Sequence, residues 1–566
     1  MNSTMEIIFG LFGGLAIFIF GMNMMSECLQ KAAGEKMKSI LSLLTKNPVL
    51  GVLAGALTTA VLQSSSATTV MAIGFVSAGL MSLPQAISII LGANIGTTMT
   101  AQIIAFKISD YIYVFIFIGF IVSFICKSQK LKNIGQTVFA FGLLFLGIET
   151  MGSVMKPLAS SPFFLNLIGK VADIPVLGVA VGTLMTLVVQ SSSATIAVLQ
   201  NFASQAGPDG MTSIIGLAGA IPILLGDNIG TTITALLASV GQSKDAKRTA
   251  IAHCVFNISG CLLFIWFVKP YAALIQHISP KGPEVEVISR QIANAHTGFN
   301  LAMTLIWIPL IPIMVKLVMK IIPDGKNKYQ LSPSAPKYLD DKLVGQPVAA
   351  LHLVAKEIVR CSELVKEMLT EAREASGEDE TVVLQRIIEK AKIEQSLNDN
   401  INEYLATMFS EGVMTEEQAA QASEMMYVLC DIDRISSLCS EISGNISKQN
   451  NEKQKFSKEA LKELRNSVGL ILEMYSGAMQ SIIRGNDIDI KNLAKKKNDI
   501  MQLDEKMRKA HMDRVGKKKC NAKLTVSFNH VLQNIDRMSN CCVNLVDMAE
   551  KHMDFYMFLE DTQEER

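Results

Sequence analysis

Gln63-Ser64-Ser65-Ser66-Ala67-Thr68 interrupts an apolar stretch near the N-terminus, and the same six residue types recur at 190–195. Each copy lies at the centre of an apolar segment, residues 48–80 and residues 176–205. Bare backbone is tolerated at membrane depth only where it is buried in protein or lines a water-filled cavity. We therefore predict that each segment is a re-entrant helical hairpin with its polar turn buried inside the protein.

A second motif follows each hairpin. Leu91-Gly92-Ala93-Asn94-Ile95-Gly96-Thr97-Thr98 recurs as Leu225-Gly226-Asp227-Asn228-Ile229-Gly230-Thr231-Thr232. Two ordered motifs at nearly constant spacing indicate an internal duplication, with repeat one at about 27–126 and repeat two at about 155–248.

Seven other apolar segments are each long enough to cross the hydrocarbon core once. They are residues 7–25, 83–106, 111–126, 134–151, 214–239, 249–268 and 295–321. Lysine and arginine gather at 31–46, 127–132, 244–248 and 316–328, and positive loops favour the cytoplasm. If both hairpins return to their own side, all four clusters are cytoplasmic and the halves have inverted topology. Counting either hairpin as a full crossing would remove that relationship.

The chain changes character after the last apolar segment. From residue 337 onward, charged and apolar residues alternate at helical spacing and no stretch is long enough to span. Residues 431–437 resemble residues 534–540, which suggests two three-helix bundles. The expected fold is all-α: a polytopic membrane domain at 1–322 with two inverted repeats, a linker at 323–348, and a soluble cytosolic helical domain at 349–566.

The serines of the repeated turns predict an anion site. Serine is a good N-cap, so the second arm of each hairpin should begin near Ser65 or Ser66 and near Ser192 or Ser193. A helix N-terminus carries free N–H groups and a partial positive charge of about +0.5. Candidate substrate ligands are these hydroxyls with the neighbouring amides: Gln63, Ser64, Ser65, Ser66, Gln190, Ser191, Ser192, Ser193, Asn94 and Asn228.

A cation is expected to travel with the anion. The deepest segments hold no lysine or arginine, and moving an anion into a negative-inside cell is opposed by about 2.3 kcal/mol per charge per 100 mV. Asp227 is the leading cation ligand, with water-facing placement at a helix end as its alternative. The neutral oxygens that could assist it are Thr68, Thr195, Thr97, Thr98, Thr231 and Thr232.

Other function classes find little support. The net charge of +1 gives no reason to expect nucleic-acid binding. The sequence contains no recognisable nucleophile–base pair or metal-ligand spacing, so an enzyme is not expected. The ten cysteines are expected to be reduced. His253 and His296 recur within Ala-His-x-x-Phe-Asn. We expect each ring to make a satisfied hydrogen bond, with proton carriage as the alternative.

The paired motifs resemble the sodium-dependent phosphate cotransporter family in its bacterial form, over about residues 5–321. The resemblance implies sodium-coupled transport of inorganic phosphate across the bacterial plasma membrane, with the Gln-Ser-Ser-Ser stretches at the substrate site. Sodium is the coupling ion, and no further cofactor is implied.

The tail resembles the phosphate-uptake regulator (PhoU-like) family, whose carboxylates can bind metal clusters. Asp433 and Asp536 keep the first acid of the family motif and are weak metal-ligand candidates. Ser437 and Asn540 replace the second acid.

Two alternatives to sodium-phosphate symport stay open. The protein could be a membrane sensor or regulated phosphate exporter that signals through its tail, or an uncoupled channel. The expected partners are phosphate, sodium and the lipid bilayer, with a homodimer and a cytosolic signalling partner of the tail left open.

Overall fold

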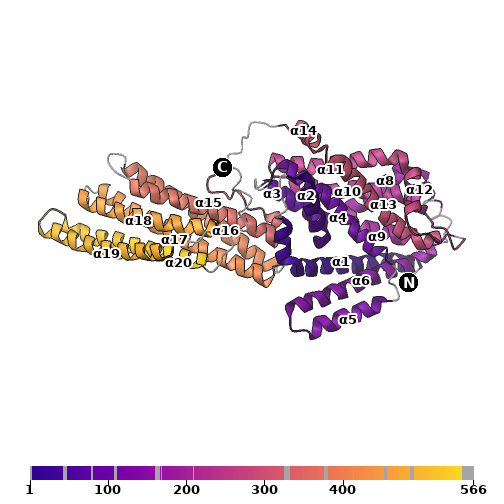
Figure 1. Cartoon of the computed structure of the whole chain (residues 1–566), viewed down its shortest axis with the longest axis horizontal. Coiled ribbons are helices and arrows are strands. Elements are labelled where there is room, and N and C mark those ends of the chain that lie inside the picture. Colours follow the sequence, from indigo (N-terminus) through magenta and orange to yellow (C-terminus); the bar gives the residue numbers. More distant parts are fainter. Residues whose placement is uncertain are drawn as a thin grey trace. The chain divides into compact units, whose positions relative to one another are not determined.

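The structure, a computed structural model, describes residues 3–550 apart from 42–46, 78–80, 107–110, 160–165, 167–168, 172, 208, 324–331, 375–379, 412–413, 452–455 and 485–489. The described residues are helical apart from turns and an isolated bridge between Ala206 and Ser213. The chain divides into two compact units, Met1–Lys326 and Asn327–Arg566 (Figure 1).

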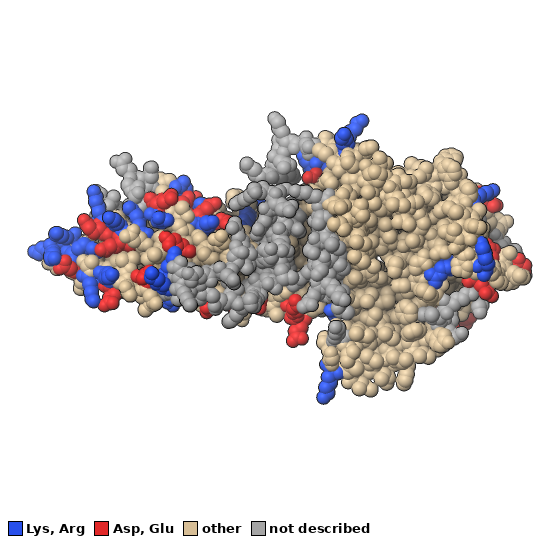
Figure 2. Space-filling view, in the orientation of Figure 1, with Lys and Arg blue, Asp and Glu red and all other residues tan. Residues whose placement is uncertain are grey.

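The first unit is made of apolar helices. Its helices are α1 (Ser3–Leu41), α2 (Pro48–Leu62), α3 (Ser65–Ser77), α4 (Leu83–Ile104), α5 (Ile112–Ile125), α6 (Gln129–Ala159), α8 (Pro175–Val189), α9 (Ser192–Ala203), α10 (Gly216–Ser239), α11 (Lys244–Phe264), α12 (Val268–Ile278), α13 (Glu284–Trp307) and α14 (Ile311–Ile321). On the face drawn in Figure 2, this unit shows few charged side chains, whereas the second unit shows many.

Five helices within the described residues are long and apolar enough to span, or six if one bent pair counts as a single span. The five are Met5–Leu29, Leu83–Ile104, Leu131–Met155, Gly216–Ser239 and Lys244–Ile278. The chain is therefore a multi-pass membrane protein, as predicted.

Two of the expected crossings need correction. The segment 295–321 is not one straight helix, because α13 and α14 meet at 85°. Pro309 lies in the break and Pro312 lies in the first turn of α14, and proline inside a helix removes a hydrogen bond and clashes with the preceding turn. The segment 111–126 forms α5, which has only 14 residues, fewer than the roughly 20 that one crossing needs.

Both hairpin segments are broken where the polar motifs predicted. Helix α2 ends at Leu62 and α3 begins at Ser65, while α8 ends at Val189 and α9 begins at Ser192. The predicted starts of the second arms are thus confirmed.

Glycines let the first arm of each hairpin touch the helix that follows it. A Cβ built on Gly92 would lie 2.0 Å from the carbonyl oxygen of Val52, and a Cβ on Gly226 would lie 2.0 Å from that of Val179. At both positions the backbones of the two helices touch. A side chain in place of either glycine would therefore push α2 away from α4, or α8 away from α10. These motif glycines therefore serve close helix packing.

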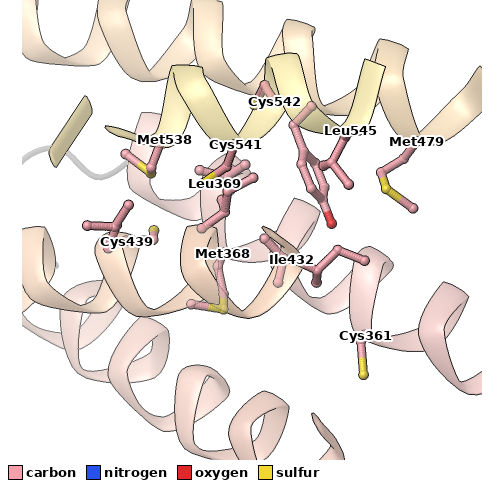
Figure 3. Close-up of a cluster of buried hydrophobic side chains, with 14 of the residues drawn as sticks. Cys361, Met368, Leu369, Ile432, Cys439, Met479, Met538, Cys541, Cys542 and Leu545 are labelled. Atoms are coloured by element: carbon pink, nitrogen blue, oxygen red, sulfur yellow. The ribbon is translucent and has the colours of Figure 1, made fainter. Parts of the chain in front are cut away.

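The second unit contains two sets of three helices. They are α15 (Pro347–Glu374), α16 (Glu380–Glu411) and α17 (Glu416–Asn451), then α18 (Lys458–Arg484), α19 (Ile490–Gly516) and α20 (Thr525–Glu550). Contacts join α15 to α18 and α17 to α20, so the two sets share one core. Sulfur-containing side chains from α15, α17, α18 and α20 gather in that core, including Cys361, Cys439, Cys542 and Met479 (Figure 3).

Candidate functional site

The two hairpin turns have the same backbone geometry. Gln63 and Gln190 adopt left-handed backbone conformations with φ of 51° and 54°. Residues other than glycine, asparagine and aspartate rarely adopt this conformation. The next residue caps the second arm: Ser64 Oγ accepts from the Ala67 amide at 3.2 Å, as Ser191 Oγ accepts from Ala194 at 3.3 Å. Strain of this kind persists only where surrounding structure holds it, and it concentrates at functional sites.

Both turns line one cavity of about 250 Å³. A water molecule occupies about 30 Å³ in the liquid, so the cavity can hold a small anion with part of its hydration shell. Helix α1 supplies the rest of the wall. The lining is Ile19, Met22, Asn23, Ser26, Leu62, Gln63, Ser64, Ser65, Ser66, Val189, Gln190, Ser191, Ser192 and Ser193. The structure thus brings together all eight predicted Gln and Ser ligands from the two halves.

The cavity is polar without being charged. None of the described residues that line it is Lys, Arg, Asp or Glu. The N-termini of α3 and α9 meet there, and the first N–H groups of a helix have no partner within that helix. Backbone dipoles and hydroxyl groups are therefore the available donors for an anion.

The two glutamines are held differently. Gln63 is buried, and its Oε1 accepts from the Thr100 hydroxyl at 2.9 Å. Gln190 is exposed to the cavity. Thr234, at the position in α10 that corresponds to Thr100, instead lies 3.1 Å from Ser66 Oγ in the other half. The site is therefore asymmetric in its contacts despite its repeated sequence.

Asp227 lies behind the second hairpin, in the middle of α10, with none of its side chain exposed. The alternative that it faces water at a helix end is therefore wrong. Its Oδ1 accepts from the Thr186 hydroxyl at 2.6 Å, and Thr186 Oγ1 is 3.1 Å from Thr195 Oγ1. Its Oδ2 has no hydrogen-bond partner within the part of the chain that the structure describes. A carboxylate and two hydroxyls thus converge where a hard cation could be held.

Repeat one has a neutral version of this cluster. Ala93 stands where repeat two has Asp227, while Thr59 Oγ1 donates to Thr68 Oγ1 at 2.8 Å. The hydroxyl pair is kept and the carboxylate is absent from this copy. The chemical difference between the two halves, Asp227 against Ala93, thus lies in the cluster behind each hairpin turn.

The remaining predicted ligands lie in α4 and α10, outside the cavity lining. Asn94 and Asn228 are buried, and each amide nitrogen donates to a carbonyl one turn earlier in its own helix. The threonine hydroxyls behave in the same way, donating to carbonyls three or four residues earlier: Thr97, Thr98, Thr231 and Thr232.

Sequence reasoning missed several polar residues of the site. Asn23 and Ser26 of α1 line the cavity, and nothing in their local sequence distinguishes them from other polar residues. Thr59 and Thr186 contact the hydroxyls behind each turn. Both threonines belong to the repeated segments, so their recurrence was a signal that could have identified them.

The rings of His253 and His296 do not make the expected hydrogen bonds to any residue that the structure describes. Both rings are buried, and neither nitrogen of either ring has a hydrogen-bond partner within the described residues. Asn257 and Asn300 donate instead to the backbone carbonyls of these histidines, one turn earlier, at 3.1 Å. The helical spacing of four residues directs each asparagine to the backbone rather than to the ring.

The second unit contains a buried acid close to one of the predicted metal ligands. No group of three His, Cys, Asp or Glu side chains suited to a metal occurs among the residues that the structure describes. Asp433 is half-buried and lies close to Glu394 of α16, which is fully buried. Burial, and secondarily the charge of Asp433, raises the pKa of Glu394 to about 8. Asp536 is also half-buried, and Asn540, one turn further on in α20, accepts from Lys497.

Comparisons with known proteins place this geometry in context. A profile of the family described as Na+/Pi-cotransporter matches residues 17–153 and 154–279. Each range contains one hairpin and the helix that directly follows it, α4 in the first range and α10 in the second. No solved structure matches the chain.

Three relatives illustrate the range of similarity. An uncharacterised protein of Bacillus subtilis, YqeW, is 33% identical over 309 residues, which is 55% of this chain and 96% of the relative. A Salmonella typhimurium protein with the provisional name inorganic phosphate export protein YjbB is 25% identical over 513 residues, 89% of this chain and 90% of the relative. The sodium-dependent phosphate transport protein 2A of Rattus norvegicus is 38% identical over 95 residues, 16% of this chain and 15% of the relative.

The lengths of these matches bear on the two units. The YjbB match is longer than Met1–Lys326, so it extends into the second unit. The YqeW match covers nearly all of that relative, which is therefore too short to contain a second unit of this size as well. The chain therefore has relatives both of nearly its own length and of little more than half of it.

Proposed function

The chain belongs to the Na+/Pi-cotransporter family, and from that membership we propose that it carries inorganic phosphate across the membrane coupled to sodium. The family is one of transporters, which agrees with the expectation that the chain is not an enzyme. The proposed location is the bacterial plasma membrane, because the relatives that cover most of the chain are bacterial.

One observation carries the proposal: both Gln-Ser-Ser-Ser turns line the same cavity. Phosphate has several acceptor oxygens and at least one negative charge near neutral pH. Two convergent helix N-termini and six serine hydroxyls supply donors for it without a fixed cation. Desolvation of the anion is thereby compensated by preformed dipoles. We assign the substrate site to the eight Gln and Ser residues of the two turns.

The sodium assignment rests on Asp227. Thr186 donates to one carboxylate oxygen and is itself 3.1 Å from Thr195 Oγ1, and the second carboxylate oxygen is buried. An isolated carboxylate buried in a membrane domain is costly unless it is compensated. A sodium ion held by Asp227 and the two hydroxyls would compensate it and would link cation binding to the second hairpin.

We also propose that the halves have inverted topology and that the second unit is a cytosolic, PhoU-like regulatory domain. Packing within the membrane unit supports the duplication on which the first part depends, because Gly92 packs α4 against α2 as the equivalent Gly226 packs α10 against α8. The positive-inside distribution of lysine and arginine supports the second. In this arrangement the second unit could respond to cytosolic conditions and adjust transport.

The test is phosphate flux into proteoliposomes that contain the full chain, with sodium and proton gradients varied separately. An inward sodium gradient should accelerate uptake and drive phosphate above its external concentration. Equal uptake in sodium-free buffer at fixed pH would overturn the coupling. Absence of phosphate flux in both buffers, by protein that is folded by size-exclusion chromatography, would overturn the substrate.

Export is the second candidate, because the relatives that match both units bear the name of a phosphate export protein. A sodium symporter runs in either direction, and its direction follows the sum of the gradients. Cells that overproduce the chain should gain phosphate if uptake prevails and release it to phosphate-free medium if export prevails. Release that persists when the sodium gradient is collapsed would favour an exporter not driven by sodium.

A further inference from the structure

Helices α1 and α6 cross each other as equivalent, antiparallel partners. A Cβ on Gly21 would lie 2.8 Å from the amide nitrogen of Leu144, and a Cβ on Gly147 would lie 2.5 Å from that of Phe18. The shift along the chain that takes Gly21 to Gly147 also takes Phe18 to Leu144. The contact is therefore reciprocal, as a local two-fold axis requires.

A second pair of contacts obeys the same shift. Gly10 faces the side chain of Val154, and the thiol of Cys28 lies 3.5 Å from Gln136 Oε1. The shift takes Gly10 to Gln136 and Cys28 to Val154. Successive residues along α1 contact residues progressively earlier in α6, so the two helices are antiparallel. Their C-terminal halves therefore point to opposite faces of the membrane.

Among the described residues of these two equivalent helices, only those of α1 line the cavity. The face of α1 that lines the cavity contains Asn23 and Ser26, both in its C-terminal half. The shift maps that face onto Phe145, Ile148, Glu149 and Gly152 of α6. Glu149 thus occupies the place in α6 that Asn23 occupies in α1, and both side chains are exposed.

The threonines behind the two turns do not make equivalent contacts. Thr234 reaches Ser66 across the repeats, whereas its equivalent, Thr100, bonds Gln63 within its own repeat. A form related by the two-fold axis would instead join Thr100 to Ser193. In that form, the wall next to the turns would be the equivalent face of α6.

We propose that Glu149 lines the opposite-facing form of the translocation cavity, at the place that Asn23 holds here, and attracts a cation to the anion at that face. This inference rests on the proposed transport function. A carboxylate close to a bound anion repels it by Coulomb interaction unless a cation accompanies it. The two faces therefore differ chemically, with a neutral wall on the side of Asn23 and an acidic wall on the side of Glu149.

The first test asks where the residue lies and does not require transport. N23C and E149C, each in the full chain, are exposed to a membrane-impermeant thiol reagent in right-side-out and in inside-out vesicles. Mass spectrometry of the labelled peptides separates the new thiols from the native ones. The two positions should be labelled from opposite faces. Labelling from the same face, or failure of E149C to react in either vesicle while N23C reacts, would overturn the proposal.

The second test measures chemistry at each face. E149Q should change the sodium concentration for half-maximal phosphate flux by at least threefold in one vesicle orientation. In the other orientation this concentration should stay the same within error. E27Q, which removes an exposed carboxylate of α1 outside the cavity lining, should change neither. An equal change at both faces, or no change at either, would overturn the role of Glu149. Opposite-face labelling without any phosphate flux would overturn the proposed substrate instead.

Discussion

The Thr186 hydroxyl lies 2.6 Å from Oδ1 of Asp227, across the contact between α8 and α10. The two residues come from different segments of repeat two, and the first repeat has alanine in place of the acid. This hydrogen bond ties the single buried carboxylate of α10 to the first arm of the second hairpin. Loss of charge at Asp227 should therefore affect sodium and phosphate together.

Replacing Asp227 with asparagine tests this link. Asparagine preserves the side-chain shape and can still accept from Thr186, but it removes the negative charge that would hold sodium. We expect the sodium concentration for half-maximal uptake to rise about tenfold or more, which corresponds to at least about 1.4 kcal/mol. Radiolabelled phosphate uptake over a sodium titration provides the measurement. D173N, the same change at an exposed site, is the control, and an unchanged titration in D227N would remove the sodium assignment.

Alanine at Ser65 or Ser192 should weaken phosphate binding without unfolding the hairpins. Neither residue is the helix cap, since Ser64 and Ser191 accept the capping hydrogen bonds. Loss of one hydroxyl donor to a charged ligand costs about 1.5–3 kcal/mol. The phosphate concentration for half-maximal uptake should rise by roughly one to two orders of magnitude.

The matched control is S153A. Ser153 is exposed on α6 and donates to the carbonyl of Thr150 in its own helix, so its removal should leave uptake unchanged. If S65A and S192A behave like S153A, the serines of the turns are not substrate ligands.

Alanine at Gly92 or Gly226 should destabilise the membrane unit. The added carbon would meet a carbonyl oxygen of the neighbouring helix at 2.0 Å in either case, and backbone cannot move aside as a side chain can. Overpacking of this kind typically costs about 1–3 kcal/mol, occasionally more. A lower midpoint of thermal unfolding in detergent would report it. G13A, where the new carbon meets nothing within 4 Å, should not lower the midpoint.

The buried acid of the second unit predicts a pH dependence of stability. The pKa of Glu394 is raised from 4.5 to about 8, mainly by burial. Below pH 4.5, Glu394 is protonated in both the folded and the unfolded state. Between pH 4.5 and about 8, Glu394 loses its proton in the unfolded state but keeps it in the folded state. Stability should therefore fall as the pH rises from about 4.5 to 8, by at most about 1.4 kcal/mol per pH unit.

E394Q should flatten that dependence and stabilise the unit at pH 8. Hydrogen exchange of the α16 and α17 amides in the full chain, compared with the unmodified protein at each pH, provides the measurement. E403Q changes an exposed glutamate of the same helix and should leave the pH dependence intact. A parallel shift in both variants would contradict the role assigned to Glu394.

The turns at Gln63 and Gln190 could be predicted from the sequence because their signal is local. Consecutive polar residues inside an apolar segment conflict with a simple membrane helix, whatever packs against them. The acid at Asp227 was identified for the same reason, since a carboxylate in an apolar helix is costly in any fold. The duplication added weight because two copies of one pattern share one explanation.

The wall at Asn23 and the contact of Thr186 with Asp227 could not be predicted in this way. They depend on which faces of α1, α8 and α10 meet, and that choice is made by backbone contacts between residues far apart in sequence. The 85° bend between α13 and α14 is likewise a result of packing, as is the lack of hydrogen-bond partners among the described residues for the rings of His253 and His296.

By itself, the sequence determined that two broken hairpins lie in a duplicated membrane domain, because polar residues in apolar segments restrict the backbone wherever they occur. Only the tertiary structure decided that both turns share one cavity and that α1 rather than α6 forms its wall. The physical reason is that close helix packing brings together groups that no local pattern connects.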